Sequence, residues 1–265
     1  MEDSRRQFLK ITGIAALGLS TASTAGVLAA DQGPQPYTRK GDEALKAKQW
    51  GLVIDTTKID HELAEKITEA CHTTHNVPFF DPEIVGPEVA KRHEIKWIWE
   101  THYHNAFVDR GSNYMSEAVE QRPILVLCNH CEEPPCCRAC PTEATYKRDD
   151  GIVIMNFHRC IGCRFCMAAC PYGSRSFNFR DPRPFIKETN LKWPTRSKGV
   201  VEKCNFCVER LAVGQPPACV EASDGAIVFG DLEDPESHIR EVLREHYTTR
   251  RRVSLGTGPA VYYII

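Results

Sequence analysis

The clearest pattern of hydrophobic and polar positions lies in residues 50–78. Residues 50–55 read Trp-Gly-Leu-Val-Ile-Asp, a short apolar run that predicts a strand. Beyond it, apolar residues recur every three or four positions, the spacing of one buried helix face: Leu63, Ala64, Ile67, Ala70 and Cys71. The pattern predicts a helix over residues 61–73, with Asp60 as its N-cap and Asn76-Val77-Pro78 as its end.

The rest of the chain predicts shorter elements. The aromatic residues of 79–111, among them Trp97, Trp99, Tyr103 and Phe107, predict a strand pair over the core. His102 and His104 would lie on those strands, exposed or hydrogen-bonded rather than bound to haem or metal. Further strands are predicted at 144–147, 152–155, 176–179 and 226–230, and a helix with a charged face at 237–248. Residues 31–48 indicate a linker, and the Pro- and Lys-rich residues 181–199 a surface insertion.

Composition changes this picture mainly through cysteine. The chain has 265 residues and a formal net charge of −2, which gives no case for a nucleic-acid partner. It contains 13 cysteines, far above ordinary usage. A disulfide framework and zinc sites built from C-x2-C pairs are the alternatives. Iron–sulfur clusters are favoured over both, because the cysteines repeat in longer runs than either alternative uses.

One of these runs is specific. Residues 160–171 follow the spacing C-x2-C-x2-C-x3-C-P, with cysteines at Cys160, Cys163, Cys166 and Cys170. In ferredoxins, three thiolates of this run bind one [4Fe–4S] cluster and the fourth binds the other cluster of a pair. A second group lies upstream at Cys128, Cys131, Cys136 and Cys140, and a third downstream at Cys204, Cys207 and Cys219. The order cysteine loop, hairpin, cysteine loop indicates an internal repeat.

The N-terminus carries a candidate export signal. Ser4-Arg5-Arg6-Gln7-Phe8-Leu9-Lys10 is followed by an uncharged, largely apolar stretch to about Ala30. This is typical of a twin-arginine signal, which suits a protein that receives its cofactors before export. Residues 1–30 are therefore predicted to be a signal peptide or, because of their length, a retained membrane anchor. The expected location is the periplasmic side of the cytoplasmic membrane.

From about Trp50 to its C-terminus, the chain resembles the four-cluster iron–sulfur subunits of bacterial membrane redox complexes, such as polysulfide, tetrathionate and dimethyl-sulfoxide reductases. The resemblance is carried by residues 50–55, Asn76-Val77-Pro78, Cys128-Asn129-His130-Cys131, Cys160-Ile161-Gly162-Cys163, Lys203-Cys204-Asn205-Phe206-Cys207, Pro216-Pro217-Ala218-Cys219 and Leu255-Gly256-Thr257. It implies an α+β fold of tandem ferredoxin-like 2x[4Fe–4S] modules with short β-hairpins and helices. The iron–sulfur domain would span 49–265, with an inner module at about 124–180 and an outer module formed by 49–123 and 200–265.

The resemblance also implies which cysteines share a cluster. The family has four cysteine groups, numbered along the chain, and pairs group one with group four and group two with group three. Here Cys71 is what remains of group one, Cys128 to Cys140 are group two, Cys160 to Cys170 are group three, and Cys204 to Cys219 are group four. The resemblance implies three clusters in this chain: Cys128, Cys131, Cys136 with Cys170; Cys160, Cys163, Cys166 with Cys140; and Cys204, Cys207, Cys219 with Cys71. The ligand positions of a fourth cluster fall on His61, Ala64, Ile67 and Ser223, so that cluster is expected to be missing. Cys137 is left over and is expected to pack as a small apolar residue.

The implied function is that of a non-catalytic electron-transfer subunit. Its expected partners are an NrfD-type quinone-interacting membrane subunit and a periplasmic redox protein such as a multihaem cytochrome c. Within the family, the exported iron–sulfur subunit of the dissimilatory-sulfite-reductase-associated (Dsr) membrane complex and its archaeal Hme-type counterpart resemble the chain best. The alternative is the iron–sulfur subunit of a molybdoenzyme that acts on a sulfur compound. An enzyme with its own substrate site is disfavoured, since no flavin or nucleotide motif and no nucleophile–base pair is recognisable.

Overall fold

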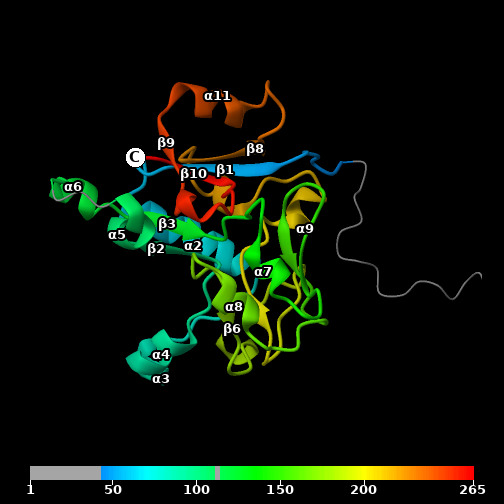
Figure 1. Cartoon of the computed structure of the whole chain (residues 1–265). Helices are drawn as coiled ribbons and strands as arrows, with labels where there is room; N and C mark the ends of the chain where they lie inside the picture. The colour runs from blue at the N-terminus through cyan, green and yellow to red at the C-terminus, as the bar shows by residue number, and fades with distance from the viewer. Residues whose placement is uncertain (1–42, 111–113) are drawn as a thin grey trace, which may run out of the picture. The chain divides into compact units, whose positions relative to one another are not determined.

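The computed structural model describes residues 43–110 and 114–265 (Figure 1), so the expected signal or anchor at 1–30 lies outside the described residues. A mixture of short helices and strands confirms the predicted combination of both element types. The strands are β1 (Trp50–Asp55), β2 (Ile98–Thr101), β3 (Ile124–Leu127), β4 (Thr145–Lys147), β5 (Val153–Met155), β6 (Ser176–Phe177), β7 (Val201–Glu202), β8 (Ile227–Asp231), β9 (Thr248–Thr249) and β10 (Val261–Ile264).

Most helices are a single turn. The α-helices are α2 (His61–Thr74), α3 (Pro82–Val85), α4 (Pro87–His93), α5 (Tyr103–Ala106), α6 (Glu117–Glu120), α7 (Pro135–Arg138), α8 (Phe165–Ala169), α9 (Val208–Leu211), α10 (Ala218–Glu221) and α11 (His238–Glu245). The described residues also form the 3₁₀ turns η2 (Val108–Arg110), η3 (Arg183–Phe185) and η4 (Val253–Leu255).

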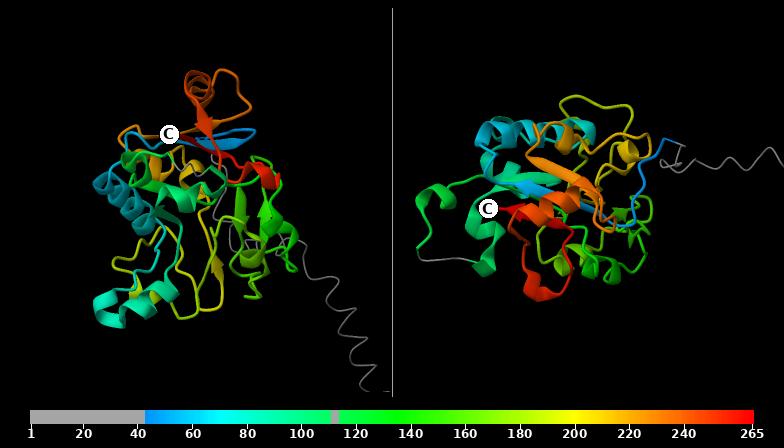
Figure 2. Two further views of the ribbon diagram at one scale, coloured as in Figure 1. Left: turned by 60° about the vertical axis from the view of Figure 1, so that its left-hand side comes forward. Right: turned by 90° about the horizontal axis from the view of Figure 1, so that it is seen from above.

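The predicted strand at residues 50–55 is correct, and it forms the centre of a four-stranded sheet. The strand order is β8-β1-β10-β9, with β1 antiparallel to β8 and parallel to β10. All six residues of β1 are buried, because α11 packs on one face of the sheet while α2 and the cysteine loops lie on the other (Figure 2). The helix predicted over 237–248 ends earlier than expected, since Thr248 and Thr249 pair with β10 as a strand.

Helix α2 confirms the second strong prediction. The Asp60 carboxylate accepts a hydrogen bond from the Leu63 amide at 2.8 Å and so caps the first turn. Ala64, Ile67 and Cys71 lie one turn apart and are buried, as the spacing indicated. This face packs against α10, which brings Cys71 towards the last cysteine group.

The prediction of a strand pair within residues 79–111 is wrong. Only β2 forms there, and it pairs with β3, in the register Ile98↔Leu127 to Thr101↔Ile124. The pairing partner lies farther along the chain, which local patterns do not reveal. His102 and His104 are not on strands either: His102 precedes α5, and the exposed His104 lies in that helix with its Nε2 2.8 Å from Glu120 Oε1.

The central hairpin is confirmed as β4 and β5, which pair from Thr145↔Met155 to Lys147↔Val153. The interpretation of residues 181–199 as a surface insertion is only partly correct. Most of the segment is exposed, but Trp193 and Arg196 reach into the interior and are buried. Among the described residues, no helix is both long and apolar enough to cross a membrane.

Candidate cluster sites

Four of the predicted ligands line one cavity. Cys128 follows β3, Cys131 lies in the next loop, Cys136 is in α7 and Cys170 ends α8. The cavity holds about 310 Å³ of space between atoms, including its opening. We call this the first cysteine site. All four thiols therefore face one space, although they come from two cysteine groups.

The loop of the first cysteine site is fixed by the C-terminal segment. Glu132 N donates to Gly258 O at 2.8 Å, and Ala260 N donates to Asn129 O at 2.9 Å. The Tyr172 hydroxyl contacts Thr257 Oγ1 at 2.5 Å. This gives the Leu255-Gly256-Thr257 motif a structural role, since its neighbours hold both cysteine-bearing segments in place.

A second cavity is lined by Cys140, Cys160, Cys163 and Cys166 and holds about 270 Å³. We call it the second cysteine site. Its loop requires glycine at position 162, where φ is +70° and an added Cβ would lie 2.5 Å from Gly199 O. The loop then enters α8 through Arg164, whose φ is +65°. This tight path turns the thiols at 160, 163 and 166 towards the same space.

The remaining predicted ligands form the third cysteine site: Cys71, Cys204, Cys207 and Cys219. Burial raises the pKa of Cys71, and the Cys204 and Cys219 thiolates raise it further. Burial likewise raises the pKa of Cys207, reinforced by the Cys219 thiolate and the Glu209 carboxylate. The chain turns sharply here, because Phe206 and Cys207 both have left-handed backbones. Backbone amides also point at sulfur: Phe206 N lies 3.5 Å from Cys204 Sγ, and Ala218 N lies 3.4 Å from Cys207 Sγ.

These features fit iron–sulfur clusters. Buried thiolates that crowd together repel one another and lose solvation, so the set needs a bound cation to be stable in its ligating form. Iron supplies that positive charge, and amides aimed at sulfur stabilise thiolate ligands. No pair among the cysteines of the described residues forms a disulfide.

The first cysteine site adjoins both of the others. The Cys128 thiolate of the first site raises the pKa of Cys204 in the third, next after burial. The Cys136 thiolate of the first site likewise raises the pKa of Cys166 in the second site. Burial is the largest cause of that rise, and Arg175 acts in the opposite direction. The first site is therefore in electrostatic contact with both the third and the second.

A buried arginine separates the first two sites, and sequence reasoning missed it. Arg175 is 5 % exposed, lines the first cavity and donates from Nη1 to Thr145 Oγ1 at 3.1 Å. The thiolates of Cys136 and Cys166, one from each site, raise its pKa against the effect of burial. Its only signal in the sequence is its place five residues after Cys170.

Two other basic residues are next to cysteine ligands in the sequence: Lys203 before Cys204, and Arg164 after Cys163. Lys203 is buried, and its ammonium donates to Cys204 O at 2.6 Å and to Val153 O. Arg164 is exposed instead, with its guanidinium 5.5 Å from the centre of the Phe177 ring. Lys203 thus holds a fixed charge between the first and third sites, whereas Arg164 lies at the surface.

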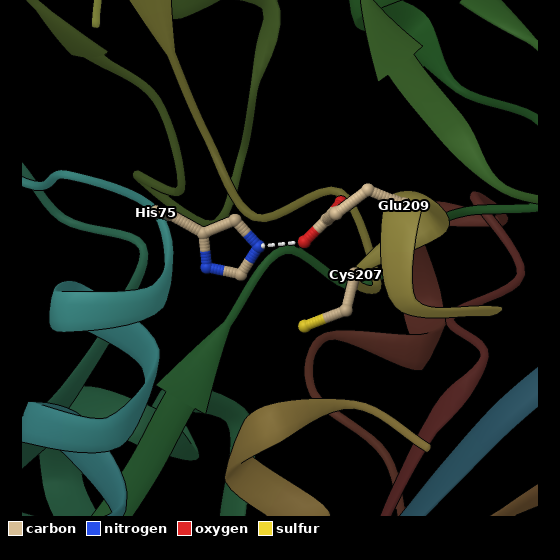
Figure 3. Close-up of side chains that lie close together, drawn as sticks. All are labelled: His75, Cys207 and Glu209. Atoms are coloured by element: carbon tan, nitrogen blue, oxygen red, sulfur yellow. Dashed lines mark ion pairs between the residues drawn. The ribbon is translucent and has the colours of Figure 1, made fainter. Parts of the chain in front are cut away.

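His75 and Glu209 form a wall of the third site (Figure 3). His75 Nε2 lies 2.7 Å from Glu209 Oε1, and His75 Nδ1 lies 2.9 Å from Cys71 O. Ligand atoms of His75, Cys207 and Glu209 all lie within 4.8 Å of one another. Because Cys207 already belongs to the four-thiol set, we interpret the histidine and carboxylate as its polar surroundings and not as a separate metal site.

The positions of the missing fourth cluster are filled by ordinary structure. Ala64 and Ile67 belong to the hydrophobic core, with 1 % and 0 % exposure. His61 faces solvent and contacts Glu100 Oε1 at 2.9 Å. The buried Ser223 hydroxyl donates to Val220 O at 2.7 Å and accepts from Ile227 N at 3.1 Å. None of these side chains is arranged to bind iron.

Cys137 lies outside the three sets of four, but it packs into the same small core as Cys136 and Cys166. It is half-buried there, against Val153, Met155 and Val201.

A wide surface cavity between α2, α4 and residues 186–188 has no cysteine in its lining. It is lined by aromatic residues and by His72, whose pKa burial lowers to about 4. The cysteine sites are therefore the centres with recognisable chemistry.

Comparison with known proteins agrees with this geometry. The model of the 4Fe-4S dicluster domain matches residues 124–182. The chain is 39 % identical to the Hdr-like menaquinol oxidoreductase iron-sulfur subunit 1 of Archaeoglobus fulgidus, covering 98 % of this chain and 97 % of that protein. It is 34 % identical to the menaquinone reductase iron-sulfur cluster-binding subunit of Nitratidesulfovibrio vulgaris, over 82 % and 88 %. It is 30 % identical to a tetrathionate reductase subunit of Salmonella typhimurium, over 100 % and 89 %.

Proposed function

The chain belongs to the family of iron–sulfur electron-transfer subunits of menaquinol-, polysulfide- and tetrathionate-type oxidoreductases, and from this premise we propose that it holds three [4Fe–4S] clusters. The proposed number of three clusters rests on one observation: twelve of the 13 cysteines lie in three sets of four. In the first two sets, the fourth thiol comes from the neighbouring cysteine group, as in tandem ferredoxin-like modules.

The ligand sets are those of the three cysteine sites. Cys128, Cys131, Cys136 and Cys170 bind the first cluster; Cys140, Cys160, Cys163 and Cys166 bind the second; Cys71, Cys204, Cys207 and Cys219 bind the third. Each cluster, when bound, supplies reversible one-electron chemistry. The protein buries all four thiols of the third site, and the charges of Arg175 and Lys203 favour the more negative state of the sites beside them.

The proposed partners are a quinone-interacting membrane subunit of NrfD type and a periplasmic redox protein such as a multihaem cytochrome c. Support comes from the relatives, one described as part of a menaquinol oxidoreductase and another as part of a menaquinone reductase. We place the chain in a hetero-oligomeric membrane complex of the Dsr or Hme type, on the periplasmic side. The full-length similarity to the archaeal menaquinol oxidoreductase subunit favours a quinone-linked complex.

The alternative is an iron–sulfur subunit of a molybdoenzyme that acts on a sulfur compound. The full-length similarity to the tetrathionate reductase subunit favours it. The two functions differ in their partners, so the subunits and metals of the intact membrane complex distinguish them. A co-purifying molybdenum protein would support the alternative, and a quinone-interacting protein with a haem protein would support the first.

The proposed function is tested by quantifying iron and acid-labile sulfide in the purified chain. Three clusters give about twelve of each per chain, because each cube contains four irons and four sulfides. Reduction with dithionite should bleach the visible absorption and produce the low-temperature electron paramagnetic resonance signals of reduced cubes. About sixteen irons per chain would restore a fourth cluster, and zinc without sulfide would overturn the proposal.

The export proposal is tested by changing both Arg5 and Arg6 to Lys, in the part of the chain outside the described residues. The protein should then stay in the cytoplasm with its clusters assembled, because the twin-arginine route depends on the arginine pair. Fractionation of cells followed by immunoblotting measures the distribution. Unchanged export of the double variant would remove the twin-arginine interpretation.

A further inference from the structure

The segment that carries the loop of the second cysteine site is strongly basic. Residues 156–200 contain nine Lys or Arg against two Asp or Glu, in a chain whose formal net charge is −2. Seven of the nine are exposed: Arg159, Arg164, Arg180, Arg183, Lys187, Lys192 and Lys198. The other two, Arg175 and Arg196, are buried. Positive charge is thus concentrated on one segment, while the remainder of the chain is acidic.

Large apolar side chains are exposed within this basic surface. Ile161 and Phe165 belong to the cysteine loop itself and are 66 % and 61 % exposed, and Phe179 is 41 % exposed. The Arg164 guanidinium lies 5.8 Å from the centre of the Phe179 ring, which joins the loop to that aromatic. Gly162 lies against Gly199 O, so Lys198 borders the same loop.

These residues form one patch beside the second cysteine site, and we call it the basic–apolar patch: Ile161, Arg164, Phe165, Phe179, Arg180 and Lys198. A loop whose only task is to hold iron has no need for exposed isoleucine and phenylalanine. Apolar centres ringed by charge are typical of protein interfaces, where the apolar core gives affinity and the charges select the partner.

We propose that the basic–apolar patch is the docking surface for an acidic redox protein, which it holds next to the second cysteine site. The proposal rests on the function proposed above. The sign of the patch identifies the partner's chemistry, because its three exposed cations, Arg164, Arg180 and Lys198, attract a negatively charged surface and repel a basic one. A protein docked on the patch lies directly beside the second site, because Ile161 and Arg164 both line that cavity.

An anionic membrane surface is the other chemistry that basic and apolar groups recognise. Membrane-surface binding by such groups usually uses an amphipathic helix with a long apolar face. Here the only helix in the patch is α8, which has five residues. The apolar groups come instead from the cysteine loop and from Phe179, which favours a protein partner, and lipid binding becomes an outcome of the test.

The test uses one haem protein in two charge states: native horse-heart cytochrome c, which is basic, and the same protein succinylated, which is acidic. Binding to the cluster-loaded chain is measured by surface plasmon resonance. The succinylated form should bind at low salt and weaken as salt is raised, because screening shortens the range of the attraction. The native form should bind at least about tenfold more weakly.

Charge reversal locates the surface. The double variant Arg180→Glu/Lys198→Glu should weaken binding of succinylated cytochrome c by about tenfold or more at low salt. Neither position is adjacent to a cysteine. The matched control reverses two exposed lysines before β1, Lys46→Glu/Lys48→Glu, in a segment that is hydrogen-bonded to Leu211 and Asp231 instead of the patch. This control should bind almost as well as the unchanged chain. A third variant, Phe179→Ser, removes an apolar contact and should weaken binding several-fold at every salt concentration.

Three outcomes would overturn the proposal: equal weakening by both charge reversals, equal binding of the two cytochrome forms, or loss of binding to phosphatidylserine vesicles by the patch variant with cytochrome binding unchanged. Absorption spectra of every variant show whether its clusters are present. A chain that lacks clusters defeats the proposed function. A chain that carries them but binds without regard to the patch defeats only the docking surface.

Discussion

Changing Cys71 to Ala is expected to destroy the third cluster and to leave the other two intact. Iron should fall by about one to four atoms per chain, depending on whether a three-iron remnant stays bound. The reason is geometric. Cys71 is the only member of the third site that comes from α2, and it lies with Cys204 and Cys219 only because α2 packs against α10.

The matched control is Cys137→Ala, which removes a thiol that lies outside all three sets of four. It should keep the full iron content and the unchanged electron paramagnetic resonance spectrum of the reduced protein. Chemical iron analysis and spectra of both variants measure the difference. Equal iron loss in the two variants, or an unchanged third cluster in Cys71→Ala, would show that the ligand sets are wrong.

The predictable part of the fold is the part whose pattern is local. Strand β1 is a short apolar run, and α2 has both a capping aspartate and a periodic buried face, so both were predicted correctly. Strand β10 was missed although it pairs directly with β1, at Leu52↔Val261. Its four residues give a weak signal, and a parallel pairing across the whole chain depends on contacts that no local window contains.

The candidate site was also predictable only where its pattern is local. The spacing of the cysteines carries most of the chemistry, because a cluster loop must place its thiols at fixed intervals. What surrounds the clusters is assembled from distant segments: Arg175, His75 and Glu209 have no common motif, yet they line or adjoin the cysteine sites. Composition was misleading for residues 181–199, since its prolines and lysines concealed the buried Trp193 and Arg196.

A buried ion pair next to His75, which borders the third site, gives the second prediction with a large expected effect. Arg196 Nη2 lies 2.6 Å from Glu202 Oε2, and both side chains are 0 % exposed. Trp97 Nε1 donates to the same carboxylate oxygen at 2.9 Å, and Asn178 Nδ2 donates to Oε1 at 2.5 Å. Arg196 also donates to His75 O and, at 2.9 Å, to Asn76 O. The pair therefore joins the end of α2 to β7, the strand before Cys204.

Replacing one partner should destabilise the protein strongly, because the other charge stays buried without its counterion. Glu202→Gln leaves the guanidinium unpaired and turns an amide donor towards existing donors. Arg196→Met leaves the carboxylate with two neutral donors only. Each should cost about 3–5 kcal/mol of unfolding free energy, which lowers the thermal midpoint by roughly 6–20 °C. Circular dichroism of the cluster-loaded variants at one scan rate measures the midpoints.

The control is the exposed pair of Lys66 and Asp224, whose atoms lie 2.7 Å apart but whose side chains are 54 % and 66 % exposed. Lys66→Met should cost less than about 1 kcal/mol, because water solvates the remaining carboxylate. The double variant Arg196→Met/Glu202→Gln decides whether the buried pair acts as a unit. Once both charges are gone, neither is left uncompensated, so the double variant should lose less than the sum of the single losses. Additive losses, or a Glu202→Gln midpoint no lower than that of Lys66→Met, would mean that the buried pair does not hold α2 against the third site.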